Sequence, residues 1–171
     1  MATAKTASSA RTGNKIGATT FTTPSDREIV MTRVFDAPRR LVFDAWTNPT
    51  HLPHWLLGPD GWTMTVCEID LRPGGASRLG WRYADGREME IQSVFQEVTP
   101  PERLVSTESW GGGWADTVNT VTFVETDGKT TVTNRMLYPS REARDGALNS
   151  GMQQGVSLSY ERLATYLQTL G

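Results

Sequence analysis

The stretch SREARDGALNSGMQQGVSLSYERLATYLQTLG, residues 140–171, decides the fold, because it predicts one long amphipathic helix running to the C-terminus. Ser140 is a good N-cap, and Glu142 places an acid in the first turn. Gly146, Gly151 and Gly155 interrupt the helix, at up to about 1 kcal/mol each against alanine. They therefore need a reason, such as a bend or a close approach to another element. The apolar positions that recur every three to four residues are Leu148, Met152, Val156, Tyr160 (or Ser159), Leu163, Leu167 and Leu170.

The chain before this helix reads as β-structure with two short helices near its start. REIVMTRVF, residues 27–35, alternates as a first strand, with Ile29, Met31 and Phe35 on one face. A helix follows over residues 38–46, and Asn48-Pro49 opens a second, very short one that Pro53 stiffens. Six more strands come next, and Asp-Gly pairs at 85–86 and 127–128 mark hairpins between them. These strands are WTMTVCEID, ASRLGWRY, REMEIQSVFQEV, RLVSTESW, TVNTVTFVE and KTTVTNRMLY.

This order of elements predicts an α+β fold with a curved, seven-stranded antiparallel sheet. The long C-terminal helix is the only element able to cover the apolar face of that sheet. A strongly twisted sheet curving round one helix leaves a gap at its open end, where the two short helices lie. We therefore expect an internal pocket between the sheet and the helix.

Five stretches carry a family resemblance, which covers about residues 27–168. They resemble the helix-grip (START/Bet v 1-like) fold of the SRPBCC superfamily, and within it the family related to the C-terminal domain of the activator of the heat-shock-protein-90 ATPase. The resemblance implies a mostly apolar cavity, and relatives include lipid binders, polyketide cyclases and stress-response co-chaperones. Fold alone does not fix the function. The stretches are VFDAPRRLVFDAWTNPTHLPHWLLGP, IDLRPGGASRLGW, YADGREMEIQSVFQEVTPPERLVST, TVTFVETDGKTTVTNRMLYPS and SGMQQGVSLSYERLATYL.

Composition limits the domain organisation and the classes of partner. Residues 1–25 are rich in Ala, Thr and Ser and read as a disordered tail, which leaves residues 26–171 as one START-like ligand-binding domain. The formal net charge is −2 with no basic stripe, which argues against nucleic acid. The sequence contains no apolar run of 18 residues, so it predicts no helix that spans a membrane. The single cysteine, Cys67, favours a reducing cytoplasm. A monomer and a homodimer both stay open.

The only two histidines, His51 and His54, stand three residues apart, a spacing that places them on one helical face. A metal site needs a third and usually a fourth ligand, and the sequence offers none nearby. We therefore expect no metal and no cofactor. His51 reads as a surface residue, whereas His54 is expected at the pocket rim, where a neutral imidazole would hydrogen-bond a ligand or act as a base.

Other polar residues leave catalysis open. Asp70, Glu90, Glu108 and Asp116 include possible carboxylates, although charges on strands usually point to solvent. An arginine pointing inward from a strand would bind a carboxylate or phenolate; the candidates are Arg78, Arg82 and Arg135. No Ser/His/Asp set, phosphate loop or dinucleotide fingerprint is present.

The leading hypothesis is the binding of an apolar or aromatic small molecule in the internal cavity. The alternatives are a cyclase- or hydrolase-type enzyme, with His54 or Tyr160 as acid–base, and a chaperone-partner module. Trp55 and Trp110 are expected at the cavity mouth, the latter beside the mobile-looking GGGW loop. The expected helix wall is Met152, Val156 and Tyr160. The expected sheet wall is Trp62, Met64, Trp81, Phe95, Val121 and Phe123.

Overall fold

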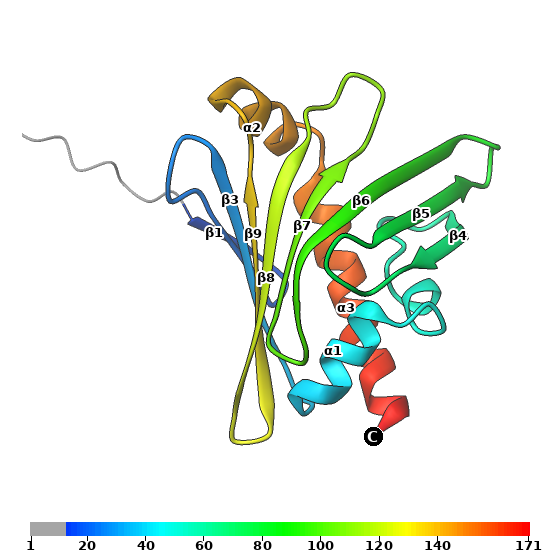
Figure 1. Cartoon of the computed structure of the whole chain (residues 1–171), viewed down its shortest axis with the longest axis vertical. Helices are drawn as coiled ribbons and strands as arrows, with labels where there is room; N and C mark the ends of the chain where they lie inside the picture. The colour runs from blue at the N-terminus through cyan, green and yellow to red at the C-terminus, as the bar shows by residue number, and fades with distance from the viewer. Residues whose placement is uncertain (1–12) are drawn as a thin grey trace, which may run out of the picture.

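One antiparallel sheet curves around the C-terminal helix in the structure, a computed structural model that describes residues 13–171 (Figure 1). The strand order in the sheet is β1-β2-β3-β9-β8-β7-β6-β5-β4. The last six strands form the expected meander, each paired with the next by short turns. The strands are β1 (Gly13–Ile16), β2 (Thr19–Thr22), β3 (Glu28–Phe35), β4 (Trp62–Ile69), β5 (Ala76–Tyr83), β6 (Glu88–Thr99), β7 (Arg103–Ser109), β8 (Thr117–Thr126) and β9 (Lys129–Leu137).

The sheet has nine strands where the sequence predicted seven, because residues 13–22 form a hairpin. The prediction of a disordered tail is wrong for this segment, while residues 1–12 lie outside the described residues. Thr19 and Phe21 of β2 are buried, and Phe21 pairs with Met31 of β3. A hairpin with so few apolar side chains carries almost no pattern of its own, and it is held by the sheet that it extends.

Two short helical elements follow β3, as expected, although their ends differ in detail. Helix α1 (Arg39–Thr47) begins after Pro38, and no described side chain caps its first turn. The second element is a single 3₁₀ turn, η1 (Leu52–His54), with Pro53 in its first turn. Proline lacks an N–H to donate, and its fixed φ suits a helix start, which explains so short an element here.

The C-terminal helix is two helices, α2 (Arg141–Leu148) and α3 (Met152–Leu170), and not one. Ser140 caps α2 as predicted, accepting a hydrogen bond from the Ala143 N–H at 3.1 Å. The break falls at Gly151, whose φ of 82° lies in the left-handed region that favours glycine. Gly155 has a different role, since a Cβ there would lie 3.5 Å from Pro59 in the loop before β4.

Alanine at these two glycines is expected to act in opposite directions. Gly151→Ala should lower the free energy of unfolding by about 1–2 kcal/mol, because a Cβ is strained at positive φ. Gly155→Ala should raise it by about 0.5–1 kcal/mol, since its Cβ would meet only ordinary contacts inside a helix. Urea denaturation of both variants checks this, and destabilisation by Gly155→Ala would show that the loop packs more tightly than the structure has it.

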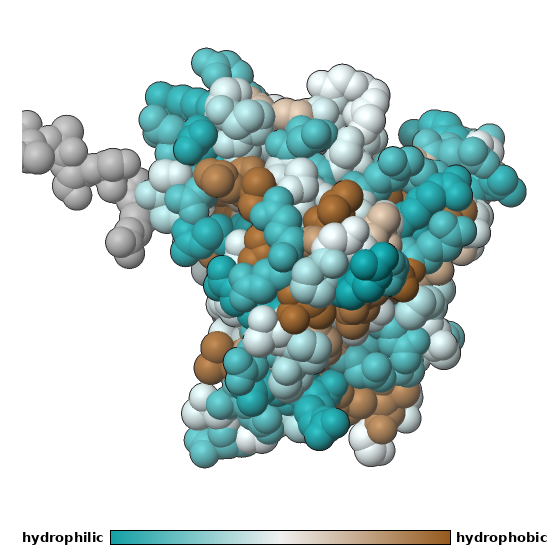
Figure 2. Space-filling model, in the orientation of Figure 1, coloured by the Kyte–Doolittle hydropathy of each residue, from teal (hydrophilic) through white to brown (hydrophobic). Residues whose placement is uncertain are grey.

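Two apolar clusters fill the space between the sheet and the helices. The larger surrounds α1 and the later turns of α3, and includes Phe35, Trp55 and Leu163. The smaller lies under α2 and the first turn of α3, and includes Phe21, Met136 and Tyr138. On the face seen in Figure 2, hydrophobic residues form several small areas separated by hydrophilic ones. Within residues 13–171, no helix combines the length and the apolar character needed to cross a membrane.

Candidate functional site

Trp55, expected at the cavity mouth, lies in the middle of the larger cluster and is 1% exposed. Its indole Nε1 donates to the Ala45 carbonyl at 2.9 Å, and its ring centroid is 5.0 Å from that of Trp46. The expectation is wrong because the single turn η1 folds Trp55 back onto α1. A fully buried tryptophan with a satisfied N–H is typical of a core.

The expected helix and sheet walls face each other, but their side chains are in contact. Tyr160 is 3% exposed, and its ring centroid is 5.8 Å from that of Phe35 and 5.5 Å from that of Trp46. The sheet-wall residues Trp81, Phe95, Val121 and Phe123 point inward and are buried, so their predicted facing is correct. The part of the interior around Tyr160 is therefore packed by aromatic side chains.

The β4 end of the predicted wall is altered by a bulge between Met64 and Val66. Met64 packs against the larger cluster, but Val66 lies on the opposite face, against Gly80. Trp62 lies near the end of the hairpin, with its ring centroid 5.2 Å from that of Tyr83. A bulge places one extra residue in a strand and so inverts the alternation after it.

Two hollows lie on the outer face of the sheet, away from α3. One of about 480 Å³ crosses β4 to β8 and includes Arg78, Gln92 and Thr107, and the other, of about 370 Å³, crosses β4 to β6. Both are open surfaces. Their charged side chains are largely paired with each other, as Arg78 is with Glu90 at 2.7 Å. Neither hollow therefore has the buried, unpaired group that a selective site requires.

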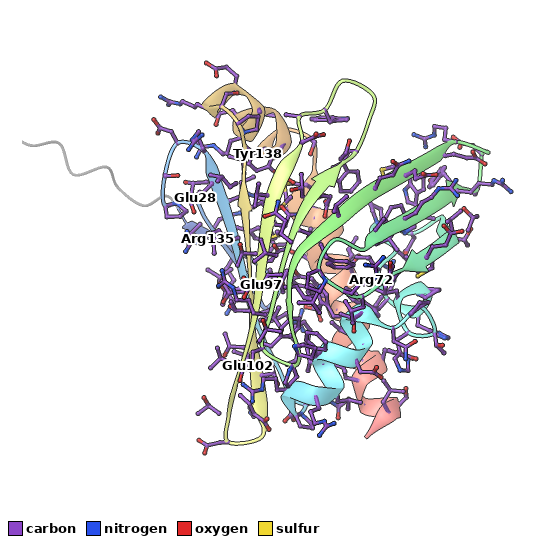
Figure 3. The ribbon with its side chains drawn as sticks, in the orientation of Figure 1. Glu28, Arg72, Glu97, Glu102, Arg135 and Tyr138 are labelled. Carbon is purple, nitrogen blue, oxygen red and sulfur yellow. The ribbon has the colours of Figure 1, made fainter. Side chains whose placement is uncertain are left out.

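The strand arginines that might have pointed inward all point outward. Arg78, Arg82 and Arg135 pair with Glu90, Glu88 and Glu28 on the outer face, and Figure 3 shows the last of these pairs at one flank of the sheet. Among the described strands, the buried arginine is Arg33 of β3, which is 6% exposed and bonds Glu161 of α3 at 2.8 Å. This arginine is already paired and is not free to bind a ligand.

The two histidines join α1, η1 and α3 at one surface. His51 Nδ1 lies 2.7 Å from the Tyr166 hydroxyl and its Nε2 lies 3.1 Å from Asp44 Oδ2. His54 stacks on Tyr166 with the rings 4.8 Å apart and 10° from parallel, so its expected place at the pocket rim is wrong. No group of three or more His, Cys, Asp or Glu side chains in residues 13–171 has the arrangement to hold a metal ion.

The feature that stands apart is Glu108, a carboxylate at the end of β7 that faces the interior. Its Oε1 accepts a hydrogen bond from Trp110 Nε1 at 2.9 Å, and its Oε2 accepts one from Asn119 Nδ2 at 2.8 Å. None of the ion pairs among residues 13–171 includes this carboxylate. Burial raises the pKa of Glu108, and these two hydrogen bonds oppose that rise only in part.

Polar side chains surround Glu108 across the inner face of four strands. In the register, Glu108 lies opposite Ser93 of β6 and Thr117 of β8, and Ser93 lies opposite Ser77 of β5. Thr117 is 2% exposed and Asn119 is 5% exposed. Their Oγ1 and Oδ1 atoms are buried and have no hydrogen-bond partner among the described residues. Buried polar atoms without partners are costly, so an ordered water or a bound molecule is expected to satisfy them here.

Aromatic side chains form a wall beside this cluster. Trp110 stacks on Trp81 with the ring centroids 6.4 Å apart and the planes 9° from parallel. Trp81 Nε1 in turn donates to the Leu56 carbonyl at 2.7 Å, which joins β5 to the loop after η1. Trp110 lies directly before the glycine-rich loop that begins at Gly111, and its expected place at a cavity mouth stays a prediction.

Tyr138 and Met152 close the cluster on the side of α2 and α3. Figure 3 shows Tyr138 at the upper end of the sheet beside α2. Its hydroxyl finds only weak thioether partners, Met136 Sδ at 3.8 Å and Met152 Sδ at 3.9 Å. Burial raises the pKa of Tyr138 to about 12, and the negative charge of Glu108 adds to the rise. Met152 thus lies beside Tyr138, with Val156 packed nearby between the two clusters, and their expected role as a cavity wall stays a prediction.

We use the name Glu108 site for Glu108, Trp110, Thr117, Asn119, Tyr138 and Met152. The alternation in RLVSTESW indicates that Glu108 faces inward, since it lies four residues after the buried Leu104 on the same strand. The sequence prediction instead followed the general rule that charged side chains on strands face solvent. Tyr160, proposed from the sequence as an acid–base, lies deeper, and burial raises the pKa of its phenol, which leaves it neutral near pH 7.

The raised pKa of Glu108 gives a pH-dependent stability with a defined sign. The penalty for the buried charge is present above the folded-state pKa, and it is relieved as the pH falls through that pKa toward the unfolded value of about 4.3. The free energy of unfolding of the wild type, minus that of Glu108→Gln, should therefore rise as the pH falls from 8 to 5. Urea denaturation across this range measures the difference.

Glu90→Gln provides a control of opposite sign. The hydrogen bond from Arg78 lowers the pKa of Glu90, so the wild-type advantage at this position should shrink as the pH falls. If the wild-type advantage over Glu108→Gln also shrank as the pH fell, the folded state would not raise the pKa of Glu108. That result would contradict the assignment.

The chain is similar to a known protein family and to several solved structures. The family described as "Activator of Hsp90 ATPase homolog 1-like protein" matches residues 36–168. No curated protein matches the chain.

Solved structures from bacteria are similar over most of the chain. One from Rhodobacter sphaeroides is 27% identical, with a TM-score of 0.85, and the match covers 90% of this chain and 99% of that one. One from Chromobacterium violaceum is 26% identical, with a TM-score of 0.67 and coverage of 81% and 96%. An AHSA1-like protein from Aeromonas hydrophila, 20% identical with a TM-score of 0.66 and coverage of 81% and 94%, shows a similarity of fold alone.

Proposed function

Because the chain belongs to the family of proteins like the activator of Hsp90 ATPase homolog 1, we propose that it is a binding module that takes a small molecule at the Glu108 site. The family and its fold are compatible with such modules but do not fix a ligand. The location of the site is therefore argued from the chain's own side chains. The expected apolar cavity around Tyr160 is packed, which moves the proposed site toward the α2 end of the interior.

The observation that carries the proposal is an inward-facing carboxylate that has no cationic partner among residues 13–171. Glu108 accepts two hydrogen bonds, while neighbouring buried oxygens of Thr117 and Asn119 have no partner among the described residues. Burying a charge without a counter-ion is costly, and such costs concentrate at functional sites. A bound molecule that satisfies these atoms would offset the cost.

The surroundings of Glu108 fit a ligand with an apolar or aromatic body. The stacked Trp81 and Trp110 rings offer a flat wall, and Met152 offers an adaptable thioether. Apolar contact alone is insufficient, since burying about 300 Å² gains only about 7–8 kcal/mol at 25 cal/mol per Å², and association costs several of these. Glu108 supplies the polar anchor that affinity and selectivity require.

Native mass spectrometry of freshly purified protein tests the proposal. Wild type should carry a small-molecule adduct that Glu108→Gln lacks or holds at a much lower fraction. Glu97→Gln, the same change at a carboxylate of β6 that pairs with Arg103 on the sheet surface, should keep the adduct. An adduct retained equally by Glu108→Gln, or the bare mass in all three proteins, would contradict the proposed site.

A chaperone-partner module is the second candidate, and the family match is the observation that favours it. Such a role would use an exposed face and would not need the Glu108 site. Stimulation of a chaperone ATPase by wild type and by Glu108→Gln alike would support it. Absence of stimulation at low ionic strength, where weak charged contacts persist, would count against it. The cytoplasm, where Cys67 would stay reduced, remains our proposed location.

A further inference from the structure

We propose that the Glu108 site selects ligands by a cationic hydrogen-bond donor, and specifically by an ammonium group next to an apolar or aromatic body. This inference rests on the proposed function and names the ligand class for the same site. Three properties of the site carry it: unused acceptors, N–H donors that already point at Glu108, and a negative charge without a cationic partner among the described residues.

The site has more acceptors than donors. An ionised carboxylate offers about four lone-pair positions, and the hydrogen bonds from Trp110 and Asn119 use two of them. The buried Oδ1 of Asn119 adds a further acceptor with no partner in residues 13–171. Each ammonium group carries three donors and no acceptor, so it complements this set, whereas a carboxylate would add acceptors to acceptors.

Most donors of the site are already committed, while the Thr117 hydroxyl, which can donate or accept, has no partner among the described residues. Trp110 Nε1 and Asn119 Nδ2 both point at Glu108, and the Tyr138 hydroxyl points toward the Met136 and Met152 sulfurs. Two N–H donors directed at one carboxyl group favour its ionised form, since a protonated carboxyl must itself donate. These hydrogen bonds offset part of the rise in pKa that burial causes at Glu108, and so favour the anion that attracts a cation.

Among residues 13–171, no basic side chain forms an ion pair with Glu108. Two arginines are buried, and each already has partners: Arg33 is bound to Glu161 of α3. On α2, Arg144 bonds Asp145 at 2.8 Å and the Ser25 carbonyl at 2.7 Å. A cationic ligand would pair with Glu108 where little water competes, while an anionic ligand would meet like charge in the same surroundings.

A series of three probes with similar apolar bodies tests the inference by isothermal titration calorimetry at pH 7.5. The probes are 2-phenylethylamine, which is cationic at this pH, 2-phenylethanol, which is neutral, and 3-phenylpropanoate, which is anionic. Wild type should bind the amine at least tenfold more tightly than the propanoate. Glu108→Gln should lose at least tenfold in amine affinity and change less than threefold for the alcohol. Glu97→Gln should behave as the wild type.

The outcomes separate the inference from the function on which it rests. Equal binding of the three probes, or a preference for the propanoate, overturns the ammonium selectivity and leaves a small-molecule site in place. Binding of none of them by the wild type overturns both. The comparison among probes uses the wild type alone, so it decides the question even where circular dichroism shows that Glu108→Gln is misfolded.

Discussion

Replacing Trp55 by alanine should lower the free energy of unfolding by about 3–5 kcal/mol, the range for removing a large aromatic side chain from a core. Trp55 is 1% exposed and lies among Trp46, Tyr160 and η1, so its loss leaves a cavity that rigid neighbours close only in part. The Ala45 carbonyl also loses its indole donor. Urea denaturation followed by circular dichroism measures the change.

Trp114→Ala is the matched control, since it removes the same side chain from the surface. Trp114 is 54% exposed, and an indole carbon lies about 4.0 Å from the Cβ position of Gly146. We expect a change within about 0.5 kcal/mol, as for most surface substitutions. A Trp55→Ala protein as stable as Trp114→Ala would mean that Trp55 lines an open space, and the packed interior described above would be wrong.

Gly75→Ala should lower the free energy of unfolding by about 3 kcal/mol or more. The new Cβ would be forced against backbone atoms that cannot move freely. A Cβ at position 75 would lie 2.1 Å from the Asp70 carbonyl oxygen and 3.0 Å from that of Arg72. The backbone there is also fixed by hydrogen bonds, from the Gly75 N–H to the Arg72 carbonyl and from the Phe95 N–H to the Gly75 carbonyl.

The neighbouring Gly74 separates this clash from simple backbone strain. Gly74 has a φ of 80° and no atom within 4 Å of its Cβ position, so Gly74→Ala should cost only about 1–2 kcal/mol. Thermal and urea denaturation of the two variants give the comparison. Similar costs at both positions would show that the turn between β4 and β5 shifts to accommodate a side chain.

The order of elements could be predicted from the sequence because each left a local pattern. Alternation in β3 placed Ile29, Met31 and Phe35 inside, and the Asp-Gly turns fixed the hairpins of the meander. The 3.6-residue period likewise placed Tyr160, Leu163 and Leu167 against the sheet. These signals are intrinsic to short segments, so one sequence suffices to recognise them.

Features without a local pattern were not predicted. The β1–β2 hairpin has few apolar side chains and is held by pairing with β3. Residues 13–22 alone therefore carry no pattern that predicts it. The sequence identified Gly151 as an anomaly but did not show that it divides the helix, since glycine permits a left-handed φ without requiring it. The β4 bulge inverts the facing of Val66 without any mark in the sequence.

The candidate site was predicted in part. Met152, Trp81 and Trp110 lie at or beside it, but Trp55 and His54 do not, because the position of η1 depends on tertiary packing. Glu108 could have been identified by extending the alternation of Leu104 through β7. The sequence does not show that Glu108 lacks a cationic partner among the described residues, because this depends on how the sheet assembles.

The most direct test of a ligand at the Glu108 site is the NMR titration of the tryptophan indole N–H signals with 2-phenylethylamine. The chain has six tryptophans, and Trp110→Phe and Trp55→Phe variants assign the two decisive signals. Trp110 Nε1–H bonds Glu108 itself, whereas Trp55 Nε1–H bonds the Ala45 carbonyl in the packed cluster. We expect the Trp110 signal to shift saturably while the Trp55 signal stays in place. A shift of Trp55 without Trp110, or of neither, would contradict it.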